Sequence, residues 1–285
     1  MVSRFFIFYI YMTNYINPFE KRKFSARFRA VFAFAKQNFV SVIKYDLLVF
    51  VAIAALFALL LSANPESKMN NLGALVNFVC FSYFTHYILN KGDMQPTTFK
   101  DMLESTAKAF GKVFVASILP FIGMVVCLLL LGILGVIFTF IVGKNIGLIV
   151  TLFFFALFVI YMVPILNIYY THYYFSNKFK DTVDTFKESY RMVKGHWWNT
   201  FGFCLLLGLI GEVSVLLISV LVLWVLPNDS SFIGLWVTFT ICFIVLFFTT
   251  HTATVFQYGH LKALKDEEQE NLKEGDSVTQ EEIQE

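Results

Sequence analysis

Long apolar runs alternate with short polar segments along most of the 285-residue chain. Six of these runs are long enough to cross roughly 30 Å of hydrocarbon as helices, which rise about 1.5 Å per residue. They cover residues 45–63, 72–90, 113–141, 146–174, 200–226 and 232–260. Because a short polar turn separates the two runs of each successive pair, the pattern predicts three transmembrane hairpins.

A basic, aromatic-rich segment precedes each predicted hairpin. The segments "RFRAVFAFAKQNF", "TFKDMLESTAKAFGKVF" and "TFKESYRMVKGHWWNTF" align so that Phe28, Phe99 and Phe186 are equivalent. Within each segment apolar side chains recur every three or four residues and cations occupy other positions, which is typical of an amphipathic helix. The sequence therefore predicts three quasi-repeats, each consisting of an interfacial helix, a bend into the membrane and a hairpin.

The predicted fold class is therefore an all-α integral membrane protein with six transmembrane helices. Residues 1–23 form an N-terminal cytoplasmic or interfacial segment, and the repeats cover 24–91, 92–178 and 179–262. Residues 263–285 carry nine acidic residues and two lysines, which predicts a tail that is helical at first and then disordered. A solvated tail and a tail that docks on a basic cytosolic partner are both open.

The composition indicates the class of protein, and the distribution of charge indicates its orientation in the membrane. The chain is 58% hydrophobic and 15% charged, with a mean hydropathy of +0.67, so one water-soluble core cannot bury its apolar side chains. Every lysine and arginine except Lys68 and Lys144 lies in the terminal segments or at the cytoplasmic ends and loops of the predicted hairpins. The positive-inside rule then predicts that both termini are cytoplasmic.

Helices with a basic face and an aromatic face are expected in the headgroup plane, where their cations approach anionic lipid. Gly195 and His196 mark the expected bend of the third repeat. The tryptophans that follow are expected to be interface anchors, with ligand stacking as the alternative. The predicted lipid-contacting residues are Arg27, Arg29, Lys36, Lys100, Lys108, Lys112, Lys187, Arg191, Lys194, Trp197 and Trp198.

A polar site inside the membrane is the second candidate. Glu212 lies near the middle of the fifth predicted span, and a charge at that depth costs about 2.5–3.5 kcal/mol on insertion scales. The sixth span offers three polar side chains across the hairpin, Thr249, Thr250 and His251. A protonated Glu212 hydrogen-bonded to one of them and a site for proton or cation coupling are both open.

Two prolines interrupt predicted spans. Pro120 lies in the third span and Pro164 in the fourth, and each removes one backbone N–H from its helix. A simple kink and a cavity lined by the released carbonyls are both compatible with this pattern.

A family resemblance rests on three stretches, "RFRAVFAFAKQNF", "TFKESYRMVKGHWWNTFGFCLLLGLIG" and "VFQYGHLKALKDEE". Together they resemble a broad group of bacterial six-span inner-membrane proteins, similar to the membrane domain attached to some glycerophosphoryl diester phosphodiesterases. The resemblance covers most of residues 20–270. It implies a bacterial inner-membrane location and no established activity, because the catalytic barrel of those phosphodiesterases is absent from this sequence.

Signatures of enzymes and cofactor sites are missing from the sequence. The five histidines have no HExxH or paired-ligand spacing, and no P-loop or GxSxG motif occurs. The four cysteines lie in predicted spans without a CxxC motif, which favours packing over a disulfide or metal site. We therefore expect no enzymatic activity, no metal and no cofactor.

The sequence thus predicts a non-enzymatic membrane protein that organises lipid or protein partners through basic interfacial helices. The expected partners are anionic lipid headgroups at the cytoplasmic leaflet and a membrane-protein complex, and no nucleic acid is expected. The alternative function is a small-solute or ion-coupled transporter or channel that uses Glu212 in a midmembrane polar site.

Overall fold

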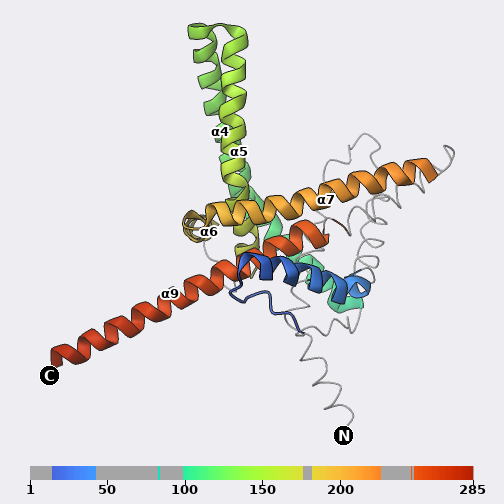
Figure 1. Ribbon diagram of the computed structural model, residues 1–285. Coiled ribbons are helices and arrows are strands. Elements are labelled where there is room, and N and C mark those ends of the chain that lie inside the picture. Colours follow the sequence, from blue (N-terminus) through green and yellow to red (C-terminus); the bar gives the residue numbers. More distant parts are fainter. Residues whose placement is uncertain are drawn as a thin grey trace. The chain divides into compact units, whose positions relative to one another are not determined.

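The computed structural model describes residues 15–42, 83, 99–175, 182–225, 245 and 247–284. These residues form helices and short connections, and no strand occurs among them, which confirms the predicted all-α class (Figure 1). They fall into two compact units. We call Phe110–Phe201 the hairpin unit, and the described residues of Met1–Ala109 and Gly202–Glu285 the terminal unit.

Three helices are long and apolar enough to cross a membrane. They are α4 (Phe99–Val142), α5 (Lys144–Phe175) and α7 (Trp197–Val225). The candidate spans within them are Phe114–Ile141, Asn145–Phe175 and Trp197–Ile218. These stretches match the third, fourth and fifth spans predicted from the sequence, and they indicate a multi-pass membrane protein.

The other three predicted spans are not shown. The first two lie outside the described residues, apart from Tyr83. Of the sixth, residues 245 and 247–260 are described, as one π-helical turn, η2 (Phe247–His251), and the start of α9 (Thr252–Gln284). Helix α9 continues without a break to Gln284, through the segment where the sequence predicted disorder after a helical start.

The hairpin formed by α4 and α5 is held together by two glycine–threonine contacts. A Cβ atom on Gly147 would lie 2.7 Å from the backbone nitrogen of Thr139, and one on Gly135 would lie 2.9 Å from Oγ1 of Thr151. Both approaches are shorter than a normal carbon contact, so only glycine fits at either position without movement. Small residues are how membrane helices bring their backbones close together.

The same threonines satisfy their own hydroxyl groups within the helices. Thr139 Oγ1 donates to the Gly135 carbonyl at 2.7 Å, and Thr151 Oγ1 donates to the Gly147 carbonyl at 2.8 Å. At the tip Gly143 adopts a φ of +89°, a left-handed conformation that glycine takes without steric cost. The hairpin is therefore specified by glycines at the turn and at both close contacts.

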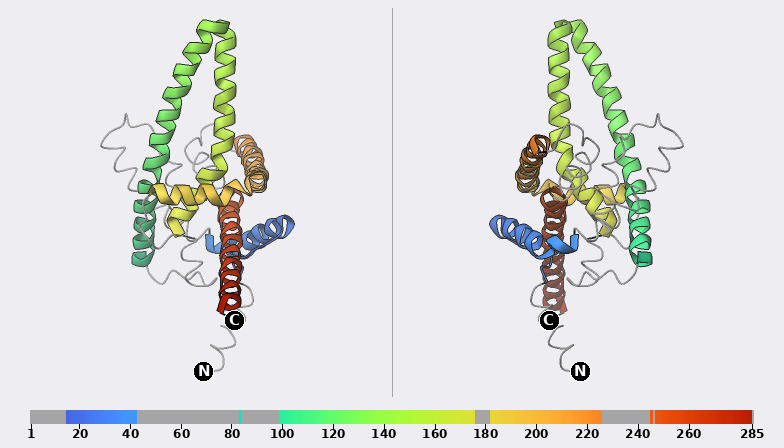
Figure 2. Two further views of the ribbon diagram at one scale, coloured as in Figure 1. Left: turned by 90° about the vertical axis from the view of Figure 1, so that its left-hand side faces the viewer. Right: turned by 90° about the vertical axis from the view of Figure 1, so that its right-hand side faces the viewer.

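Apolar side chains cover the outer surface of this hairpin. Phe140 is 86% exposed, and the most apolar stretch of the α4 span contains no residue that the described chain buries. A surface of this size and apolarity is a site of contact with lipid or with another membrane protein. Figure 2 shows α6 (Thr182–Lys194) lying crosswise at the base of the α4–α5 hairpin.

The second and third basic segments differ in how they join their spans. The third is a separate helix, α6, which ends before a turn at Gly195 and His196, where the His196 N–H donates to the Val193 carbonyl. The second belongs to one uninterrupted helix, α4, about 66 Å long. The helix break predicted in the second repeat is therefore absent, although Gly111 stands close to the expected bend.

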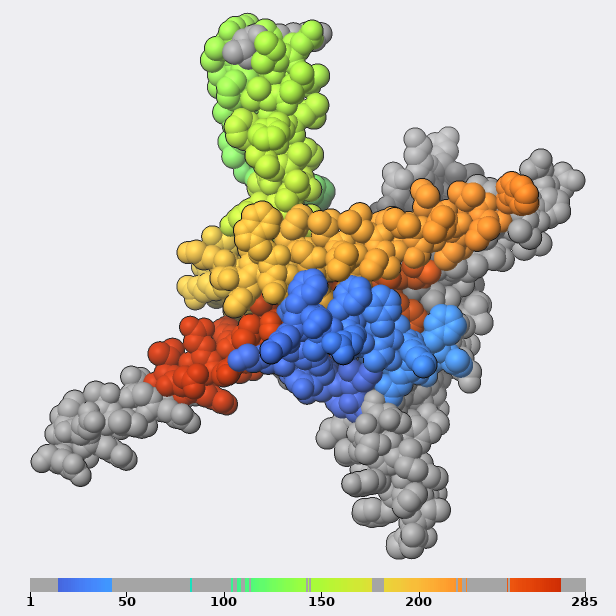
Figure 3. Space-filling model, in the orientation of Figure 1, coloured from blue at the N-terminus to red at the C-terminus, as the bar shows by residue number. Residues whose placement is uncertain are grey.

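The terminal unit has an aromatic core around a helix over residues 24–42. The buried face of this helix carries Arg27, Val31, Phe34, Asn38 and Val42. Phe34 meets Tyr83 and Phe256 edge-on, with ring centroids 6.5 and 5.8 Å apart. Figure 3 shows the surface of this helix against the surfaces of α7 and α9.

An N-terminal segment, residues 15–23, crosses α9 at Gly259. A Cβ atom on Gly259 would collide with the carbonyl oxygen of Pro18, so a glycine is required for the crossing. On either side of it Phe19 contacts the Tyr258 ring, and the Arg22 N–H donates to His260 Nδ1 at 3.2 Å. These contacts bring residues from both ends of the chain together.

Candidate functional site

An aromatic cluster, Tyr161, Trp197, Trp198 and Phe201, joins α5 to the start of α7 in the hairpin unit. The Trp197 ring stacks on Phe201 at 4.9 Å between centroids and on Tyr161 at 6.2 Å, and Trp198 meets it edge-on at 4.7 Å. Offset and edge-on pairs of this kind each contribute about 0.5–1.5 kcal/mol beyond their buried area. The cluster therefore fixes the turn between α6 and α7 against α5.

The hydrogen-bond acceptor of this cluster lies three residues before a proline in α5. Pro164 has no N–H and cannot donate to the Ile160 carbonyl. The next carbonyl, that of Tyr161, accepts a hydrogen bond from Trp197 Nε1 at 3.2 Å. This acceptor is not the Ile160 carbonyl that Pro164 releases, so the simple kink and the carbonyl-lined cavity both stay predictions.

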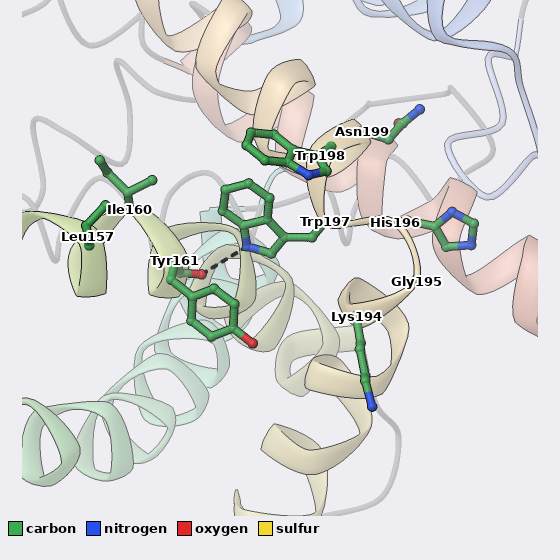
Figure 4. Close-up of a pocket in the computed structure, with 9 residues that line it drawn as sticks. All are labelled: Leu157, Ile160, Tyr161, Lys194, Gly195, His196, Trp197, Trp198 and Asn199. Atoms are coloured by element: carbon green, nitrogen blue, oxygen red, sulfur yellow. Dashed lines mark hydrogen bonds between the residues drawn. The ribbon is translucent and has the colours of Figure 1, made fainter.

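The groove has a volume of about 680 Å³ and lies between α5 and the α6–α7 turn. Leu157, Ile160 and Tyr161 form its apolar wall, and residues 194–199 form the other side. Figure 4 shows the apolar wall facing Trp197 and Trp198, while His196 points away from it. The wall residues were missed in the sequence analysis, because their apolar side chains do not stand out within a predicted span.

The groove lies where the lipid-exposed part of α5 ends. Large apolar side chains are exposed on α5 from Ile146 to Val163, a rise of about 26 Å. The next residues, beginning with Pro164 and Ile165, are buried. The groove, the tryptophans and Lys194 therefore lie beside the end of this exposed apolar stretch, whose length of about 26 Å is close to the roughly 30 Å of a bilayer core. Tryptophan and tyrosine are enriched at the interfaces between membrane and water.

Helix α6 separates its cations from its buried face. Thr185, Ser189, Met192 and Val193 are buried. Lys187, Arg191 and Lys194 are exposed on one face, as predicted for the third repeat. His172 Nε2 of α5 lies 3.2 Å from Glu188 Oε2 of α6 and links the two helices.

The apolar stripe of α6 is used differently from the prediction. Val193 is fully buried, and the Phe186 ring packs on Tyr169 of α5 at 5.7 Å. The amphipathic pattern predicts that these side chains insert into lipid. They pack within the hairpin unit instead, and this apolar contact holds the crosswise helix at the base of the hairpin.

The cations of the second segment are already engaged. Lys108 forms an exposed ion pair with Glu104 at 2.7 Å. Lys112 Nζ donates to the Tyr174 carbonyl at 3.0 Å, at the end of α5, where unsatisfied carbonyls attract a cation. Burial lowers the pKa of Lys112. The Lys100 side chain lies outside the described residues. The two described lysine side chains of this segment, Lys108 and Lys112, both have partners, so neither is free for the predicted lipid contact.

Arg27 differs from the prediction that it contacts lipid. Its side chain is fully buried in the terminal unit, with the guanidinium 4.8 Å from the Phe203 ring centroid and 5.8 Å from that of Phe24. Burial lowers the pKa of this guanidinium to about 10. Arg27 therefore belongs to the core, where its planar cation packs between rings.

The exposed part of the same helix does keep the predicted amphipathic pattern. Phe24, Phe32 and Phe39 are 39%, 43% and 48% exposed and follow one another at helical spacing. Arg29 and Lys36 are exposed on the neighbouring strip of the helix. This surface combines aromatic rings with flanking cations, which suits an interface between water and hydrocarbon.

The midmembrane polar site is not assembled in the described structure. Glu212 is exposed on α7, and no hydrogen bond or ion pair among the described residues joins it to Thr249, Thr250 or His251. These three residues lie in the π-helical turn η2, where Thr249 Oγ1 donates to the Val245 carbonyl at 2.8 Å. The Thr249 hydroxyl is thus directed to its own helix.

No cluster of three or more histidine, cysteine, aspartate or glutamate side chains that could hold a metal ion occurs within the described part of the chain. The groove and the basic face of α6 are therefore the features with recognisable binding chemistry. Comparisons of the sequence with protein-family models and with curated proteins, and of the fold with solved structures, find no match.

Proposed function

We propose that this protein is a non-enzymatic component of a bacterial inner membrane that organises lipid or protein partners through basic interfacial helices. One observation carries the proposal. Helix α6 lies crosswise at the base of an apolar hairpin and exposes Lys187, Arg191 and Lys194 (Figure 2). A helix with this orientation and charge lies along an anionic membrane surface, where each cation contributes about 1 kcal/mol to binding.

The helix over residues 24–42 supports the same function from the terminal unit. Its buried face holds it to the chain, and its exposed strip presents Phe32 and Phe39 beside Arg29 and Lys36. Rings in the acyl region and cations among the headgroups would give this strip a second lipid contact. We place both basic helices on the cytoplasmic side, because the positive-inside rule favours that orientation.

The predicted resemblance to the membrane domain attached to some phosphodiesterases stays a prediction, and it adds no activity to this proposal. The proposed role needs no substrate turnover. It needs a surface that recruits anionic lipid, or a protein with a complementary acidic surface, to the base of the hairpin.

The proposal is tested by purifying the protein in a gentle detergent and identifying by mass spectrometry the lipids and proteins that remain bound. A variant with Lys187→Gln, Arg191→Gln and Lys194→Gln is expected to lose the anionic lipid or partner that accompanies the wild type. A Lys108→Gln variant is the control, because Lys108 lies outside α6 and its 2.7 Å ion pair with Glu104 is shorter than the 3.5 Å between Lys187 Nζ and Asp184 Oδ1. Equal retention by all three proteins would contradict the proposal.

A further inference from the structure

We infer that the groove between α5 and the α6–α7 turn binds one anionic phospholipid, with the headgroup phosphate at Lys194 and an acyl chain along Leu157 and Ile160. The inference rests on the proposed function, because it requires α6 to lie at the membrane surface. It goes further by naming one site and one class of ligand. A general attraction of cations to the membrane needs neither the groove nor its apolar wall.

The shape of the groove suits part of a lipid molecule. Its volume of about 680 Å³ lies within the range of about 300–1,000 Å³ that is usual for small-molecule sites. It is smaller than a whole phospholipid, so it holds the headgroup and the first part of one chain. Leu157, Ile160 and Tyr161 are 46%, 43% and 44% exposed, which leaves this apolar wall open to an acyl chain.

The charge at the groove selects an anion. Lys194 is exposed at its edge, and none of the ion pairs among the described residues involves it. The carboxylates of α6 are engaged elsewhere, since Glu188 lies beside His172 and Asp184 lies 3.5 Å from Lys187 Nζ. A phosphate at Lys194 thus meets a cation without a competing carboxylate from α6, and a choline or other cationic group would be repelled.

The frame of the site is rigid before any ligand binds. Trp197 is fixed by its stacking on Phe201 and by its hydrogen bond to the Tyr161 carbonyl, whereas Trp198 is 79% exposed beside it. A preformed site loses less conformational entropy on binding than a flexible one. Trp198 is therefore placed to pack on the glycerol region of a lipid whose chain follows α5 (Figure 4).

Native mass spectrometry of the delipidated protein tests this inference. The protein is titrated with phosphatidylglycerol and, separately, with phosphatidylcholine of the same acyl chains. The wild type is expected to bind a first phosphatidylglycerol at least fivefold more tightly than phosphatidylcholine. Lys194→Gln is expected to remove that preference, and Ile160→Trp, which fills the groove, is expected to abolish the first binding event for both lipids.

Lys187→Gln is the matched control, because Lys187 is exposed on the same face of α6 but does not line the groove. The site is supported if this variant keeps the fivefold preference. It is contradicted if Lys187→Gln and Lys194→Gln weaken binding equally, or if Ile160→Trp has no effect. Equal weakening would leave the proposed function intact, whereas the proposed function itself fails if the variant lacking all three α6 cations retains as much anionic lipid as the wild type.

Discussion

The two compact units are stabilised by opposite means. In the hairpin unit the transmembrane helices meet where side chains are small, at Gly135 and Gly147, and large apolar side chains such as Phe140 face outward. In the terminal unit large rings face inward, and even an arginine, Arg27, is buried among them. Lipid provides no hydrophobic force between helices, so close backbone contact has to replace ring packing in the hairpin.

This difference explains why a similar sequence pattern has two structural outcomes. Aromatic residues spaced three or four apart appear in every basic segment, and in the sequence they predict insertion into lipid. Val31 instead packs in the core of the terminal unit, while the adjacent Phe32 is 43% exposed. Whether such a side chain meets lipid or protein depends on which elements of the fold cover it.

The largest loss of stability is expected from Arg27→Ala, which tests whether inward-facing side chains stabilise the terminal unit. Loss of a buried guanidinium between two rings, with a cavity in its place, should lower the free energy of unfolding by about 3 kcal/mol. Arg29→Ala is the control, since Arg29 is exposed on the same helix, and it should change stability by less than about 0.5 kcal/mol. Thermal unfolding in detergent measures both, and equal effects would show that Arg27 is not in the core.

A smaller loss is expected in the hairpin unit from Gly147→Ala. The added methyl group meets the Thr139 backbone, which cannot rotate away, and such overpacking costs about 1–3 kcal/mol. Gly123→Ala is the matched control, because a Cβ atom there meets nothing within 4 Å. Denaturant unfolding of the two variants compares them. If Gly147→Ala is as stable as Gly123→Ala, the close contact of the hairpin is refuted.

The smallest change in global stability is expected from Gly259→Ala, which should displace residues 15–23 from α9. The methyl group collides with the Pro18 carbonyl, but the crossing segment is short and can move away at a cost of about 1 kcal/mol. Trypsin should then cleave after Lys21, Arg22 or Lys23 about fivefold faster. A cost of about 1 kcal/mol makes the displaced, cleavable state of the segment about fivefold more populated. Gly202→Ala is the control and should leave the cleavage rate unchanged, because a Cβ atom there meets nothing within 4 Å. If trypsin cleaves the Gly259→Ala and Gly202→Ala variants at the same rate, the crossing is contradicted.

The three spans that the structure describes and the break after α6 could be predicted from the sequence, because hydropathy sets span length and Gly195 marks a turn. The close contact of the hairpin was also accessible, since Gly135 and Thr139, like Gly147 and Thr151, have the spacing of a small-residue motif.

Other features could not be predicted, because they depend on which segments meet in three dimensions. The burial of Arg27 requires Phe203, which is distant in sequence, and the groove requires α5 to meet the α6–α7 turn. The role of Lys112 requires the end of α5 to lie beside it. Periodicity assigns a residue to a face of its helix, but it does not identify the partner of that face.

The orientation of α6 in the membrane tests the central claim most directly. Nitroxide labels at Val183→Cys and Lys194→Cys, both exposed and on one face of α6, report depth through their accessibility to oxygen and to a water-soluble nickel complex. A helix lying along the surface places both labels at headgroup depth, within a few Å of each other. A difference near 17 Å, the rise of about 11 residues along an upright helix, would contradict the account.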